Sequence, residues 1–265
     1  RFDTSKVPNT SATAASSGSD LNGKAAEAAA LAIRQRLVDF AAQRHAVPAA
    51  SIRFAAGQVD LGDGRQIRFA ELARAAYGAR ISLSSTGFYR TPKIHWDSRS
   101  LTGRPFFYFA YGMAVAEVAI DTLTGETRVL RVDVLHDVGS SLNPALDLGQ
   151  IEGGLLQGIG WLTAEELWWN RAGELKTHAP STYKIPSARD WPVDARIRLL
   201  EGVPNREDTI HRSKAVGEPP FMLAIAVFHA LRDAVAGCGP AGTCPVLDAP
   251  ATPEALLRAI AAIDQ

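Results

Sequence analysis

The sequence predicts an α+β fold in which hairpins and long helices are mixed. Three observations lead to this prediction. An Ala-rich helical run lies near the start, two β-branched runs are joined by a short Thr-Gly turn, and apolar helical runs lie toward the end. Strand and helix patterns do not alternate regularly along the chain, so a doubly wound parallel sheet is not expected.

The first third of the chain shows a loop, a helix and then short elements. Residues 4–20 are rich in Thr, Ser, Ala and Asn, which leaves little capacity to form a core and predicts a loop. Asp20 or Asn22 is suited to cap a long helix over residues 23–44. Turn signals and short apolar runs then predict a hairpin-like segment over 51–68, a short helix over 69–77 and a strand over 81–85.

The rest of the chain is dominated by longer runs. Residues 106–121 alternate like a long strand and are expected to pair with 127–136 across a turn at 123–126. The remaining patterns predict a loop and then a helix within 145–169, a strand over 197–200, a helix over 221–236, and a last helix over 253–263 after a Pro-rich linker.

Composition and charge exclude several function classes. The chain has 265 residues, and its 28 Lys and Arg balance its 28 Asp and Glu, so there is no basic footprint for nucleic acid. No window holds 18 consecutive apolar residues, so no membrane span is expected, and no signal peptide is visible. The chain starts with Arg1 and without a methionine, so we expect a piece of a longer polypeptide.

Two cysteines, Cys238 and Cys244, lie in a Gly- and Pro-rich stretch. Two thiols cannot supply the four ligands of an iron–sulfur cluster. A disulfide would close only a small loop, and free thiols are the favoured interpretation. The six histidines show no metal-ligand spacing.

Glu218 is the leading catalytic candidate. It lies between a glycine and two prolines in Ser213-Lys-Ala-Val-Gly-Glu-Pro-Pro220, just before an apolar helical run. Proline suits the first turn of a helix, so Glu218 is expected near the positive end of the helix dipole, which favours the ionised carboxylate. A fixed, ionised carboxylate suits a general base. The alternative is that Glu218 only caps the helix.

Gln150 is the leading ligand-binding candidate. It lies in the segment 137–160 among five glycines that allow close approach of a backbone or a ligand: Gly149, Gly153, Gly154, Gly158 and Gly160. Its amide could bind a flat heterocycle through two hydrogen bonds. The alternative is helix packing through small residues, and a dinucleotide-binding fingerprint is not supported by the flanking pattern.

The run from Thr13 to Ser19 combines hydroxyls, small side chains and backbone N–H groups ahead of a helix start. Such a combination can bind a phosphate or another anion. The alternative is a solvated linker.

Three segments, 7–20, 103–160 and 213–233, resemble in order and spacing the C-terminal part of the molybdenum-binding subunit of the xanthine dehydrogenases, a branch of the molybdenum hydroxylases. The connecting motifs Ser84-Ser-Thr-Gly-Phe-Tyr-Arg-Thr-Pro92 and Pro180-Ser-Thr-Tyr-Lys-Ile-Pro186 agree with it. The resemblance implies a molybdopterin-binding fold, with residues 1–237 as the family-like core and 238–265 as a linker and terminal helix.

The resemblance also implies roles for single residues. Glu218 would be the base beside the molybdenum, taking a proton from a metal-bound hydroxyl that attacks a purine carbon. Gln150, in Gly149-Gln-Ile-Glu-Gly153, would approach the molybdopterin.

The Ala- and Ser-rich run would line the same cofactor. Ala15 would lie near the metal, and Ser16 and its neighbours near the pterin or its phosphate. Gly18 stands where relatives carry a further serine, and Ser17 and Ser19 flank it.

What the resemblance implies beyond this chain is an oxidoreductase that converts hypoxanthine or xanthine to urate in the cytoplasm. FAD and [2Fe–2S] clusters would belong to other domains or a partner subunit, in a dimer of heterodimers, and the upstream part of the same subunit would complete the site. The alternatives are an aldehyde oxidase or another N-heterocycle hydroxylase of the family, and a non-catalytic interaction module that keeps the fold.

Overall fold

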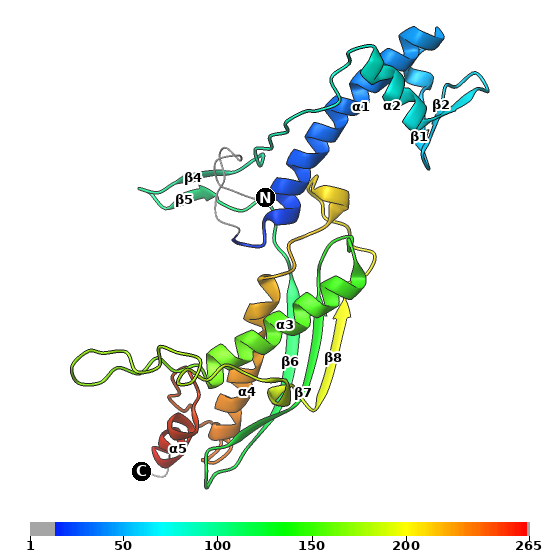
Figure 1. Ribbon diagram of the computed structural model, residues 1–265. Helices are drawn as coiled ribbons and strands as arrows, with labels where there is room; N and C mark the ends of the chain where they lie inside the picture. The colour runs from blue at the N-terminus through cyan, green and yellow to red at the C-terminus, as the bar shows by residue number, and fades with distance from the viewer. Residues whose placement is uncertain (1–13, 264–265) are drawn as a thin grey trace. The chain divides into compact units, whose positions relative to one another are not determined.

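The computed structural model describes residues 14–263, and the chain divides between Phe107 and Tyr108 into two compact units, each described by itself below (Figure 1). Most of the predicted loop at 4–20, including Thr13, lies outside the described residues. The α+β prediction is confirmed, because helices and small sheets are mixed in both units. The division into two units was not predicted.

The N-terminal unit is organised around one long helix. A short π-helix, η2 (Gly18–Asn22), leads into α1 (Gly23–His45), which ends where Ala46 takes a left-handed conformation. The other elements of this unit are η3 (Ala49–Ser51), β1 (Arg53–Ala55), β2 (Gln58–Asp60), β3 (Gln66–Arg68), α2 (Phe69–Gly78), β4 (His95–Asp97) and β5 (Thr102–Arg104).

A small core joins the C-terminal half of α1, the antiparallel sheet β1-β2-β3 and α2. Its buried residues are Leu37, Val38, Ala41, Ile52, Val59, Leu61, Leu72 and Ala76. The structure contains counterparts of the helices predicted over 23–44 and 69–77 and of the hairpin-like segment predicted over 51–68.

The predicted strand over 81–85 is wrong. This segment pairs with no strand of the described chain. The guanidinium of Arg36 donates to the carbonyl oxygens of Ser82 (3.2 Å) and Ser84 (2.8 Å) instead. These bonds hold the segment against α1 without forming a sheet.

The C-terminal unit is a three-stranded sheet, β6-β7-β8, covered on one face by helices α3 and α4 (Figure 1). β6 (Gly112–Ile120) and β7 (Thr127–His136) form the predicted antiparallel hairpin, and β8 (Asp194–Leu199) runs parallel to β7. The remaining elements are α3 (Pro144–Thr163), η4 (Ala188–Asp190), η5 (Ile210–Arg212), η6 (Pro219–Ala224), α4 (Ile225–Ala236) and α5 (Pro253–Ala261).

Several boundaries differ from the sequence prediction, including those of the strand expected over 197–200, which is β8 (Asp194–Leu199). The hairpin strand starts at Gly112, and residues 106–111 precede it without strand pairing. Helix α3 begins at Pro144, without the loop that was predicted at the start of 145–169. The Asn143 side chain accepts a hydrogen bond from the backbone N–H of Leu146 and so caps the helix.

The core of this unit lies between the sheet and the helices. Val132 and Val134 of β7 belong to one buried cluster with Ile151 and Leu155 of α3, and the inner face of α4 contributes to the same cluster. The segment Pro219–Ala236, η6 plus α4, is long and apolar enough to cross a membrane by length and composition. Its inner residues Ala224, Val227, Leu231 and Val235 belong to the core.

Candidate functional site

Glu218 stands at the entrance to a continuous helical segment. It is the N-cap residue of η6, with Pro219 and Pro220 in the first turn, and α4 follows directly. Its side chain is exposed and makes no capping hydrogen bond to the described helix. Glu218 therefore stands at the N-terminal end of a helical segment, where the helix dipole is positive.

Two glycines of α3, Gly154 and Gly158, allow η6 to pack closely on α3. A Cβ atom on Gly154 would lie 3.3 Å from the carbonyl oxygen of Gly217, and one on Gly158 would overlap the carbonyl oxygen of Phe221 and lie 2.7 Å from the Ala224 Cβ. At Gly158 only glycine lets the two backbones come so near, whereas a Cβ atom at Gly154 would be a tight contact. The packing alternative for the glycine-rich segment is thus confirmed at these two positions.

The other side of α3 is open. A Cβ atom on Gly149 or Gly153 would meet no described atom within 4 Å. Gln150 lies beside them with an exposed side chain, one helical turn before Gly154. Residues four apart share a helix face, so Gln150 lies on the same side of α3 as Gly154, the glycine that η6 approaches.

The segment before Glu218 is irregular, and main-chain hydrogen bonds anchor it. Ser213 forms a β-bridge with Gly139, and the backbone N–H of Lys214 donates to the carbonyl oxygen of Val138 at 2.8 Å. The backbone N–H of Ala215 donates to the Tyr108 hydroxyl at 2.8 Å. Sequence reasoning missed Tyr108, whose role depends on a contact between positions 107 residues apart.

Buried side chains reinforce the same anchor. The hydroxyl of Thr209 and the amide of Asn205 both donate to the carbonyl oxygen of Ser213, at 2.6 and 3.0 Å. Both side chains are buried, so these bonds are shielded from competition by water. Sequence reasoning missed both residues as well.

An ion pair lies beneath this anchor. The Lys214 ammonium is 2.5 Å from the Asp137 carboxylate, and the two side chains are only 8% and 4% exposed. Next to them is His136, whose ring nitrogens have no hydrogen-bond partner in the described chain. Burial lowers the pKa of His136 below its usual value. The negative charge of Asp137 raises this pKa and the positive charge of Lys214 lowers it, but burial has the largest effect. The ring is therefore neutral near pH 7.

The remaining predicted residues belong to the N-terminal unit. Ala15 and Ser16 both have left-handed backbone conformations, with φ of 57° and 50°. Ser17 occupies the N-cap position of η2 without a side-chain capping bond, and its hydroxyl donates to the Ala14 carbonyl oxygen at 2.9 Å. Ser19 is exposed in the first turn. The serines thus surround the start of a helical segment, where hydroxyl and backbone N–H groups suit an anion.

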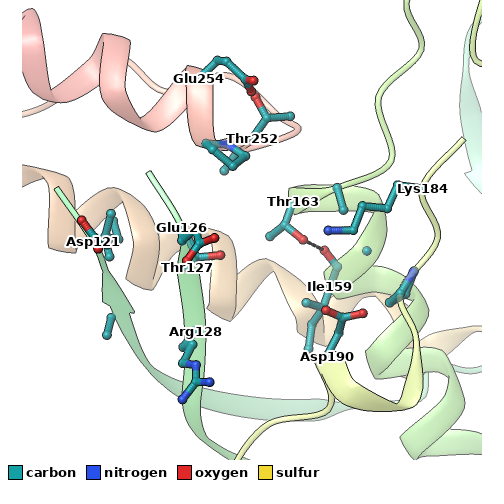
Figure 2. Close-up of a pocket in the computed structure, with 17 residues that line it drawn as sticks. Asp121, Glu126, Thr127, Arg128, Ile159, Thr163, Lys184, Asp190, Thr252 and Glu254 are labelled. Carbon is teal, nitrogen blue, oxygen red and sulfur yellow. Dashed lines mark hydrogen bonds between the residues drawn. The ribbon is translucent and has the colours of Figure 1, made fainter. Parts of the chain in front are cut away.

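A separate cavity of about 690 Å³ lies at the other end of α3 (Figure 2). Its wall includes Thr163, Lys184, Asp190, Thr252 and Glu254, and none of the predicted site residues lines it. It is therefore distinct from the Glu218 region.

Neither a metal cluster nor a disulfide is found among the described residues. Residues 14–263 contain no group of three or more His, Cys, Asp or Glu side chains that could hold a metal ion. Cys238 and Cys244 are exposed free thiols, as favoured from the sequence. Arg232 donates to the Cys244 sulfur at 2.9 Å.

Comparison with known proteins gives a family match over most of the chain. A family model described as molybdopterin cofactor-binding domain matches residues 1–192. Xanthine dehydrogenase from Oryza sativa subsp. japonica is 45% identical over 267 residues, and xanthine dehydrogenase/oxidase from Mus musculus is 43% identical over 262. Each alignment covers 97% of this chain and 18% of the relative, so the chain spans about a fifth of their length.

Solved structures show the same fold. Quinoline 2-oxidoreductase from Pseudomonas putida 86 aligns with a TM-score of 0.76 and 29% identity, covering 94% of this chain and 30% of that one. The CO dehydrogenase from Oligotropha carboxidovorans aligns with a TM-score of 0.80 and 20% identity, covering 98% of this chain and 31% of that one. The latter likeness concerns the fold alone.

Proposed function

Because this chain belongs to the family of molybdopterin cofactor-binding domains, we propose that it forms part of the active site of a xanthine-dehydrogenase-type molybdenum hydroxylase. The substrate is a purine, hypoxanthine or xanthine. The observation that supports the proposal is an exposed carboxylate, Glu218, at a Pro-Pro helix start, directly after Gly217, whose carbonyl oxygen lies close to Gly154 of α3. The relatives named xanthine dehydrogenase support the choice of substrate.

The donor groups of this chain fit a pterin phosphate. The open face of α3 at Gly149 and Gly153 leaves room for a flat ring beside the amide of Gln150. Ser16, Ser17 and Ser19 offer hydroxyls at a helix start, which suits an anionic group. Ala15, with its small side chain, leaves space next to them.

In this proposal Glu218 is the general base. Its carboxylate accepts the proton that is released when an oxygen nucleophile attacks an electron-poor purine carbon. The helix dipole of η6 and α4 favours the ionised form that this role needs. When bound, the molybdenum cofactor supplies the two-electron redox chemistry. General-base catalysis of this kind contributes about 10²–10⁴-fold in rate.

The rest of the enzyme must supply what this chain lacks. Two cysteines cannot supply the four ligands of an iron–sulfur cluster. In this proposal the [2Fe–2S] clusters and FAD belong to other domains or a partner subunit, as in the xanthine dehydrogenase family. The upstream part of the same subunit provides the other walls of the purine site. A cytoplasmic dimer of heterodimers is the assembly that we propose.

A substrate panel tests this proposal. The holoenzyme that contains this chain is assayed for molybdenum and pterin content and for turnover of xanthine, an aromatic aldehyde and quinoline. We expect the highest kcat/KM with xanthine. Preference for the aldehyde or for quinoline would support another branch of the family, and a protein without cofactor would support a non-catalytic module.

A further inference from the structure

We propose that Lys214 and Asp137 are positioning residues for Glu218: their buried ion pair fixes the irregular segment 213–217 and thereby the place of the carboxylate that follows it. This inference rests on the proposed role of Glu218 as the base.

Lys214 joins three parts of the C-terminal unit through one ammonium group. Its Nζ donates to the Asp137 carboxylate at 2.5 Å and to the carbonyl oxygen of Phe109 at 2.9 Å. The same atom lies 5.2 Å from the centre of the Tyr111 ring, within range of a cation–π contact. The residue four positions before Glu218 is therefore tied to the ends of both β6 and β7.

Asp137 connects Lys214 to Gly139, which is itself bridged to the neighbour of Lys214. Its Oδ2 accepts from Lys214, and its Oδ1 accepts from the backbone N–H of Gly139 at 2.8 Å. Gly139 in turn bridges to Ser213, the neighbour of Lys214. Gly139 has a φ of +62°, and a Cβ atom there would overlap the carbonyl oxygen of Arg212, so glycine is needed for this close approach.

The energetics favour a positioning role over a purely stabilising one. A buried ion pair adds little net stability over well-packed apolar residues, because both charges lose their hydration. Removal of one partner is costly, because the other charge then stays buried and unpaired. What the pair supplies is a directional contact, which excludes other arrangements of a segment that belongs to no helix or strand and makes only one isolated β-bridge, at Ser213.

The test separates position from stability by using two variants of the holoenzyme. Lys214→Met leaves the Asp137 carboxylate buried without its partner. Lys214→Met combined with Asp137→Asn removes both charges, while the Asn side-chain oxygen can still accept from Gly139. We expect the single variant to unfold at a lower temperature and the double variant to recover most of that loss.

The expected functional result differs from the expected stability result. In the double variant, kcat for xanthine should stay about 10- to 100-fold lower, with KM within about twofold, because a misplaced base weakens only the transition state. Hydrogen exchange of the Lys214 and Ala215 amides, which bond to Val138 and Tyr108, should be about tenfold faster or more. Molybdenum content should be unchanged.

Two controls make the outcome decisive. Leu256→Ala, in the buried face of α5, should lower stability with kcat unchanged. Glu218→Gln, measured alongside, tests the base itself. Normal kcat and normal amide exchange in the double variant, with an inactive Glu218→Gln, would overturn the positioning role alone. Full activity of Glu218→Gln would overturn the proposed function and this inference with it.

Discussion

Replacement of Gly158 by alanine should destabilise the chain, although alanine is the better helix former. The gain in helix propensity is about 1 kcal/mol. Against it stands the added methyl group, which would overlap the Phe221 carbonyl oxygen and lie 2.7 Å from the Ala224 Cβ. Overpacking of this kind costs about 1–3 kcal/mol, because η6 must move away from α3. The net loss is therefore about 1 kcal/mol.

Gly153→Ala on the same helix is the matched control. A Cβ atom there meets no described atom within 4 Å, so the propensity gain of about 0.5–1 kcal/mol is not opposed. In thermal unfolding, Gly158→Ala should lower Tm by about 2–4 °C, and Gly153→Ala should raise it by up to a similar amount. If both substitutions change Tm in the same direction, the two-sided description of α3 is wrong.

Two further predictions concern Gln150 and His136. Gln150→Ala should lower molybdopterin content or turnover while leaving Tm nearly unchanged, because the side chain is exposed; normal cofactor content and normal kinetics would instead indicate a packing role. Burial holds the pKa of His136 below its unfolded value of about 6.5, so its stabilising contribution is present above pH 6.5 and lost as pH falls from there toward the folded pKa. His136→Leu should therefore flatten the fall in the denaturation midpoint between pH 7.5 and 5.5, and an unchanged slope would assign that fall to other groups.

Local patterns predicted the elements that depend on neighbours in sequence. The helix over 23–44 follows from a continuous Ala-rich run, and the hairpin β6-β7 follows from two β-branched runs around a tight turn. The position of Glu218 at a helix start followed from Pro219 and Pro220. In each case the information lies within a few residues.

The missed features depend on long-range contacts. The prediction of a strand over 81–85 was wrong. Carbonyl oxygens of this segment accept hydrogen bonds from the guanidinium of Arg36, which is far away in the sequence. The Lys214–Asp137 pair joins positions 77 residues apart, and neither residue has a sequence signal beyond its own charge. The glycines of α3 indicated that a backbone or a ligand approaches this helix closely. The sequence could not tell which glycines the approach involves, because that depends on the packing of η6 on Gly154 and Gly158.

The most direct test of the central claim is the turnover number per bound molybdenum in the Glu218→Gln holoenzyme. Glutamine keeps the size of the side chain and removes its ability to take a proton. We predict a molybdenum content close to that of the unmodified enzyme. The turnover of xanthine per molybdenum should fall by a factor of about 100 or more. An unchanged turnover per molybdenum would contradict the role of Glu218 as the base.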